Sequence, residues 1–89
     1  MSAILITYDL NKPGQDYDRL YEKIKGLGDW WHYLDSTWIV ITYISIADVR
    51  DQLLQVMDSS DNLLILNISG DAYDGWLSKD AWDWLKSHV

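Results

Sequence analysis

The residue whose type and position most invite a chemical role is Asp9, which follows the apolar opening run 4–8. A carboxylate at the point where a central strand leaves the core could hold a hard divalent cation, as magnesium-dependent cleavage of a phosphodiester requires. One aspartate per chain provides too few ligands unless a twofold axis brings a second copy of it. The alternative, which we favour, is that Asp9 begins an Asx turn before Pro13 and Gly14, because acids after strands usually make turns.

Six tryptophans in 89 residues are the second set of candidate functional side chains. Aromatic rings can stack on nucleic-acid bases, but their neighbours here are acids: Asp29, Asp74, Asp80 and Asp83. Neighbours on a strand face opposite ways, so Trp30 and Trp31 do not share one core. We therefore predict that some tryptophans lie in a protein interface, where this residue is enriched. The candidates are Trp30, Trp31, Trp38 and Trp84.

The other residue types that carry chemistry form no recognisable catalytic or metal-binding pattern. The sequence has no cysteine, which excludes disulfides, thiolate metal sites and a thiol nucleophile. His32 and His88 are far apart, so a surface or interface role is favoured for both. The stretch 70–75 is acidic and lacks the lysine of a phosphate-binding loop. No catalytic residue is therefore predicted.

The charge balance points towards a protein partner. Fourteen acids against seven lysines and arginines give a formal net charge of −7. Binding of duplex nucleic acid depends on basic side chains that neutralise phosphates, and acids interleave the cluster of bases at 12–25. Nucleic acid is thus disfavoured, and a protein partner, including a basic one, is favoured. The simpler alternative is a soluble protein whose copies are kept apart by like charge.

The elements that would position these side chains follow from hydrophobic periodicity, and 89 residues suffice for one domain, 1–89. Strands are expected at 4–8, 30–34, 37–44 and 63–68, where apolar, aromatic and β-branched residues run together. A helix is expected at 15–27, with Asp16 as its cap. A second helix should follow the capping box of Ser45 and Asp48, and Ser78 should cap a last helix that runs almost to Val89.

This order of elements predicts an α+β fold of the ferredoxin-like, split βαβ type, with an antiparallel sheet and an extra C-terminal helix. The first strand should lie beside the last, both inside the sheet. Strand 37–44 is apolar on both faces, so it is central or is covered by another subunit. No apolar run is long enough to span a bilayer, and the start lacks signal-peptide features, so we expect no membrane partner and a cytoplasmic location.

Three stretches together resemble the small CRISPR-associated Cas2-like proteins: residues 4–10, residues 34–40 and the acidic turn 58–62 that precedes a strand. The many tryptophans and the ending Trp84-Leu85-Lys86 are closer to the stand-alone SinR-like branch. The resemblance implies a ferredoxin-like homodimer. It also implies that some relatives are metal-dependent nucleases, in which the aspartate ending the first strand of each protomer faces one divalent ion, while others are non-catalytic scaffolds. Only Asp9 falls on that metal position.

Two departures from the family decide between these roles. The acidity of this chain disfavours nucleic acid, and a helix replaces the C-terminal strand that some relatives use across their dimer. We therefore expect a dimeric, non-catalytic binding or regulatory module for another protein. The alternative is an endonuclease that binds Mg²⁺ or Mn²⁺ at Asp9 and prefers RNA to DNA, which a basic groove of Lys12, Lys25 and Arg50 would support. A mobile-element accessory that binds a host factor is a third hypothesis.

Overall fold

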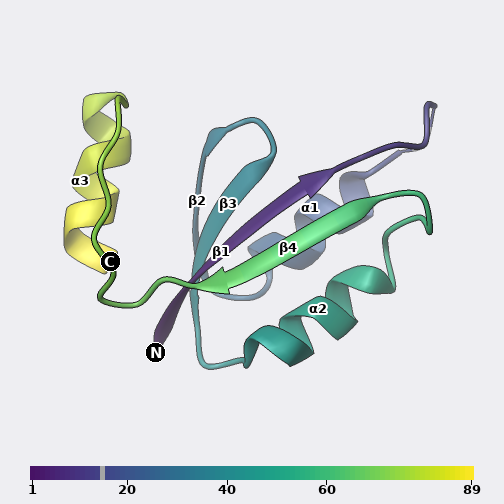
Figure 1. Cartoon of the computed structure of the whole chain (residues 1–89), viewed down its shortest axis with the longest axis horizontal. Helices are drawn as coiled ribbons and strands as arrows, with labels where there is room; N and C mark the ends of the chain where they lie inside the picture. Colours follow the sequence, from purple (N-terminus) through teal and green to yellow (C-terminus); the bar gives the residue numbers. More distant parts are fainter. Residues whose placement is uncertain (15) are drawn as a thin grey trace.

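The computed structural model describes residues 1–14 and 16–89. These residues form a small α+β fold, a four-stranded antiparallel sheet with three helices (Figure 1). In chain order the elements are β1 (Ser2–Asp9), α1 (Asp18–Lys25), β2 (Asp29–Leu34), β3 (Thr37–Thr42), α2 (Ile46–Leu54), β4 (Asn62–Asn67) and α3 (Lys79–His88). The predicted α+β class, antiparallel sheet and additional C-terminal helix are confirmed. Among the described residues, no helix has the length and apolar character needed to cross a membrane.

The strands lie in the order β2-β3-β1-β4, and each neighbouring pair is antiparallel. The prediction that β1 is central and lies beside β4 is confirmed. The prediction that β4 also lies inside the sheet is wrong, because β4 is an edge strand. Its apolar run suggested burial on both faces, but only Leu63 and Ile65 pack against the core, while Leu64 and Leu66 are exposed.

The larger core lies between one face of the sheet and the helices α1 and α2. Alternate residues of β1 point into it, namely Ile4, Ile6 and Tyr8. β3 adds Trp38 and Val40, and the helices add four buried side chains, which are Leu20, Ile24, Val49 and Leu53. Burial of these side chains is the main favourable term that holds the two helices on this face.

The helix boundaries follow their caps. The side-chain oxygen of Ser45 accepts the backbone N–H of Asp48 at 3.2 Å, and that of Ser78 accepts the N–H of Ala81 at 3.4 Å, so both predicted caps are confirmed. The predicted cap at Asp16 is wrong in position: the N-cap residue of α1 is Tyr17, and Asp16 accepts the N–H of Asp18. The predicted start of this helix at Gln15 lies outside the described residues.

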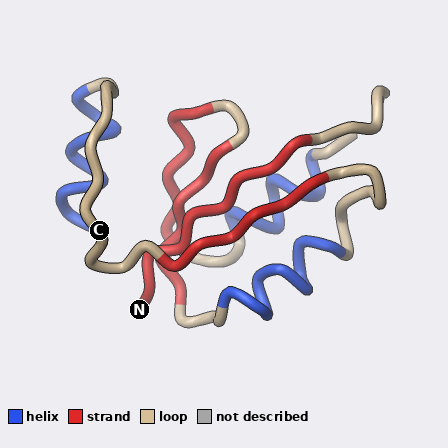
Figure 2. Tube along the Cα trace, in the orientation of Figure 1, coloured by secondary structure: helices blue, strands red, loops and turns tan. Residues whose placement is uncertain are grey.

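The second face of the sheet carries an apolar row that crosses all four strands. Strand register places Trp31 opposite Ile39, Ile39 opposite Leu5 and Leu5 opposite Leu66, so these side chains share one face. α3 stands apart from α1 and α2 (Figures 1 and 2) and packs on the Trp31 and Ile39 end of the row through Ala81 and Leu85. α3 does not reach the β4 end of the row, and Leu66 there is 46% exposed.

Candidate functional site

Asp9 lies exposed at the end of β1, opposite Asn62 of β4. It borders a shallow hollow of about 190 Å³ whose other lining residues are Thr7, Tyr8, Asn62, Leu63 and Leu64. Among the described residues, no second acid and no base lines this hollow. Within residues 1–14 and 16–89, no three histidine, cysteine or acidic side chains are grouped closely enough to hold a metal ion. A metal site at Asp9 would therefore need ligands from a second copy of the chain.

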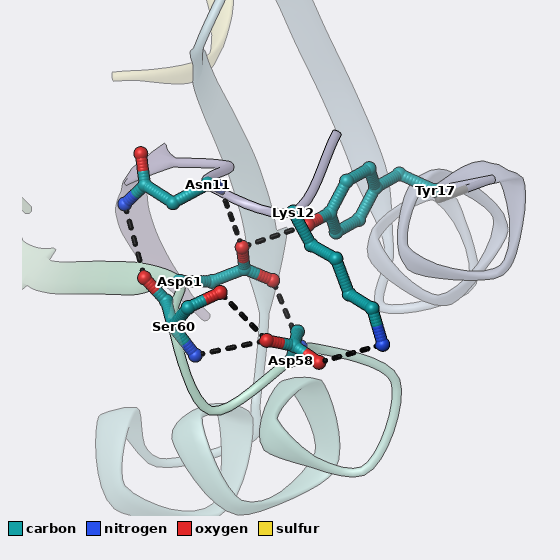
Figure 3. A network of polar contacts seen from close by, with 6 residues as sticks. All are labelled: Asn11, Lys12, Tyr17, Asp58, Ser60 and Asp61. Atoms are coloured by element: carbon teal, nitrogen blue, oxygen red, sulfur yellow. Dashed lines mark hydrogen bonds and ion pairs between the residues drawn. The ribbon is translucent and has the colours of Figure 1, made fainter. Parts of the chain in front are cut away.

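The turn that follows β1 is fixed by an acid from a distant part of the sequence, Asp61 (Figure 3). The carboxylate of Asp61 accepts the backbone N–H of Asn11 at 2.8 Å and the hydroxyl of Tyr17 at 2.7 Å. It also accepts the backbone N–H of Asp58 at 2.8 Å. These bonds join the loop between β1 and α1 to the loop between α2 and β4.

Asp58 completes this network from the same turn. Its carboxylate accepts the hydroxyl of Ser60 at 2.6 Å and the backbone N–H of Ser60 at 3.0 Å, and it pairs with the ammonium of Lys12 at 3.2 Å. The bonds from Ser60, together with Lys12, lower the pKa of Asp58 to about 2. Both acids of the turn are thus bonded to donors of the protein, and their arrangement serves to hold two loops together.

None of the three bases that would support an endonuclease lines the hollow beside Asp9. Lys12 pairs with Asp58. Arg50 pairs with its neighbour Asp51 at 3.0 Å. Lys25 lies 5.2 Å from the ring centroid of Trp30, and it lines a separate aromatic hollow near β2. The basic groove that nucleic-acid binding would call for is not formed by these residues.

The four candidate interface tryptophans differ in how much surface they retain. Trp38 is 2% exposed; its indole N–H donates to the hydroxyl of Tyr8 at 2.9 Å, and the ring of His32 stacks on it at 3.8 Å. Trp31 is also buried, and its indole N–H donates to the carbonyl of Ala81 at 3.2 Å. These two rings hold the chain's own elements together. Trp30, which is 43% exposed, and the half-buried Trp84 keep surface for a partner.

A groove on the second face of the sheet is the site that sequence reasoning missed. Its volume is about 410 Å³, and it lies between α3, the segment 71–77 and the sheet. The sheet contributes Leu5, Trp31 and Ile39, and α3 contributes Trp82 and Leu85. The loop segment contributes acids and aromatic side chains, which are Asp71, Tyr73, Asp74 and Trp76.

Trp76 stands out in this groove because 98% of its surface is exposed. Tyr73, in the same segment, stacks on Trp82 of α3 with ring centroids 6.3 Å apart. From the sequence, the stretch 70–75 was interpreted only as an acidic loop without the lysine of a phosphate-binding loop. The available signal was Tyr73 inside that polar stretch and Trp76 directly after it, since large aromatic side chains that are left exposed can mark an interaction surface.

Comparison with known families finds no family model that matches the chain, and no solved structure matches it. The resemblance to Cas2-like proteins therefore rests on the short motifs of the sequence.

Proposed function

We propose that this chain is a small, acidic, homodimeric protein of the Cas2-like, SinR-like type that acts as a non-catalytic binding or regulatory module for another protein. The observation that carries the proposal is the incompletely covered second face of the sheet, with exposed Leu64, Leu66 and Trp76. Large exposed apolar patches on a folded domain mark interaction surfaces. We propose a cytoplasmic location for this module.

The strand order supports a ferredoxin-like fold for this proposal. β3 lies between β1 and β2 and is antiparallel to both, so β1 and β2 run parallel without touching. α1 connects them and packs on the same face as α2. A βαβ unit split by an inserted antiparallel strand is the defining arrangement of that fold.

The β4 edge supports self-association. Leu64 is 55% exposed and Leu66 is 46% exposed, and both lie on the second face of the sheet, where Leu66 is opposite Leu5. A twofold axis near β4 would place each leucine against a copy of the same patch, as the interface of a symmetric dimer requires. Trp30 lies on β2, at the opposite edge of the sheet, and Trp84 lies on α3, so the surface that these two tryptophans keep is not part of this interface.

The geometry of the acids supports a non-catalytic role. No other described acid lines the hollow at Asp9, and Asp58 and Asp61 are bonded to donors of the protein. Cleavage of a phosphodiester by metal ions needs several oxygen ligands arranged around the cation. One chain does not bring such a set together in the described residues.

The second candidate function is a metal-dependent endonuclease in which Asp9 of two protomers shares one Mg²⁺ or Mn²⁺ ion. One observation favours it: Asp9 is exposed at an open strand end, whereas Asp58 and Asp61 are only partly exposed within their network. RNA would be the preferred substrate, because a single strand requires a less extensive basic surface.

The two functions are separated by incubating the protein with labelled RNA and DNA in the presence of Mg²⁺ or Mn²⁺. Wild type, Asp9→Ala and the exposed control Asp35→Ala are compared at equal concentration. The proposal predicts no cleavage above background in any of the three. Cleavage by wild type and Asp35→Ala that disappears in Asp9→Ala and on addition of a chelator would overturn it in favour of the endonuclease. Equal traces in all three samples indicate a contaminating nuclease.

A further inference from the structure

We infer that the groove between α3, the segment 71–77 and the second face of the sheet binds a basic, apolar segment of the partner protein. This inference rests on the proposed role as a protein-binding module, and it adds the site and the chemistry of the partner. The groove lies beside the β4 patch assigned to self-association, and Leu64 and Leu66 do not line it.

The floor of the groove suits apolar side chains. Leu5, Ile39 and Leu85 line it, and its volume of about 410 Å³ can take several side chains of a bound segment. Trp76 at the rim is almost fully exposed, and Tyr73 beside it is 45% exposed. Tryptophan is the residue type most enriched among those that dominate binding energy, and its burial by a partner would remove a large apolar surface from water.

The charge of the residues that line the groove indicates the charge of the segment that binds there. Asp71 and Asp74 line the groove, and no lysine or arginine is among its described lining residues. A lysine or arginine of a bound segment can pair with these carboxylates and lie over the ring of Trp76. A second copy of this chain, with its net charge of −7, would meet repulsion at the same place. The complementary occupant is therefore a basic segment, not another copy.

The experiment uses three synthetic peptides of equal length as probes. The first carries leucine and lysine at helical spacing. The second replaces leucine by serine at the same charge, and the third replaces lysine by glutamate. Binding is followed by the shift of the indole N–H signals in NMR spectra and by calorimetry. We expect saturable binding of the leucine–lysine peptide with a shift at the Trp76 signal. The other two peptides should bind at least roughly tenfold more weakly. Equal binding of the serine–lysine peptide would overturn the inference, because general charge attraction would then explain the result.

Variants locate the site. Trp76→Ala should weaken binding of the leucine–lysine peptide roughly tenfold. The pair Asp71→Asn/Asp74→Asn should weaken it several-fold, whereas Asp29→Asn/Asp48→Asn, the same charge change at exposed positions outside the groove, should not. Wild-type affinity in Trp76→Ala, or equal losses in the two double variants, would overturn the inference.

Sedimentation of the same samples separates this inference from the proposed dimer. Peptide binding by a monomeric wild type would support the groove site and remove the dimer from the proposed function. A stable dimer that binds none of the peptides would overturn the groove site and leave the dimer in place. Loss of self-association in Trp76→Ala would show that a second copy occupies the groove, which also overturns the inference.

Discussion

At the scale of single residues, Asp58 and Asp61 explain why the acidic turn 58–62 is present. The carboxylate of Asp61 accepts three hydrogen bonds, which come from donors on two loops. The carboxylate of Asp58 accepts a hydrogen bond from Ser60 and forms an ion pair with Lys12. Each bond favours the charged form of the carboxylate, and this is why the pKa of Asp58 falls to about 2. The same bonds fix the loop that follows Asp9.

The lowered pKa makes this network sensitive to acid. The ordinary pKa of an aspartate is 3.8, whereas that of Asp58 in the folded chain is about 2. Stabilisation by its charged form is therefore complete above about pH 4 and is lost as the pH falls from about 4 to about 2. We predict that Asp58→Asn lowers the urea midpoint of unfolding at pH 6, and that its difference from wild type shrinks between pH 4 and pH 2. The control Asp35→Asn should follow wild type throughout, and a constant difference for Asp58→Asn would contradict the assignment.

Sequence reasoning could identify Asp9 as a strand-end acid and the stretch 58–62 as a turn, because both are local patterns. It could not pair Asp61 with Tyr17 or Asn11. Those contacts join residues 44 and 50 positions apart, and only the folded sheet brings them together. The same limit applies to Trp31 and Trp38, whose burial depends on which face of the sheet each helix covers.

At the scale of elements, Gly28 controls how closely the turn after α1 approaches β3. A Cβ atom at Gly28 would lie 1.9 Å from the carbonyl oxygen of Ile41, which is far inside van der Waals contact. At Gly26 the nearest atoms would lie 3.5 Å away, at ordinary contact distance, and the backbone there is helical. The two glycines therefore form a matched pair for substitution.

We predict that Gly28→Ala destabilises the fold by about 2 kcal/mol or more, because the backbone of β3 must move to admit the methyl group. Gly26→Ala should be neutral or stabilising by up to about 1 kcal/mol, since alanine restricts the unfolded chain. Urea unfolding of both variants measures the difference. Equal stability of the two would show that the turn at Gly28 does not approach β3 as closely as described.

Hydrophobic periodicity predicted the elements themselves well, since apolar stripes and caps are local signals. Ser45 and Ser78 cap α2 and α3 as expected. The position of β4 was not predictable in this way, because an apolar run of its length is compatible with burial on two faces or on one. The sequence also did not predict which part of the sheet α3 would cover. Because α3 packs on Trp31 and Ile39, those side chains are buried, whereas Leu66 stays exposed.

At the scale of the whole molecule, the two faces of the sheet differ in how completely they are covered. α1 and α2 bury one face, whereas α3 covers only part of the other. The incompletely covered face holds both the leucine patch of β4 and the groove with Trp76. The proposed function assigns self-association to the first and a basic partner to the second.

Sedimentation velocity across a range of concentrations tests this account most directly, using wild type, Leu66→Lys and Leu54→Lys. Leu66 and Leu54 are similarly exposed, at 46% and 53%, but Leu54 lies on α2, which packs on the other face of the sheet from Leu66. The account predicts that wild type and Leu54→Lys sediment as dimers. Leu66→Lys should sediment as a folded monomer, because a lysine on each side of the twofold axis brings like charges together. A wild type that stays monomeric, or a Leu66→Lys variant that dimerises as wild type does, would contradict it.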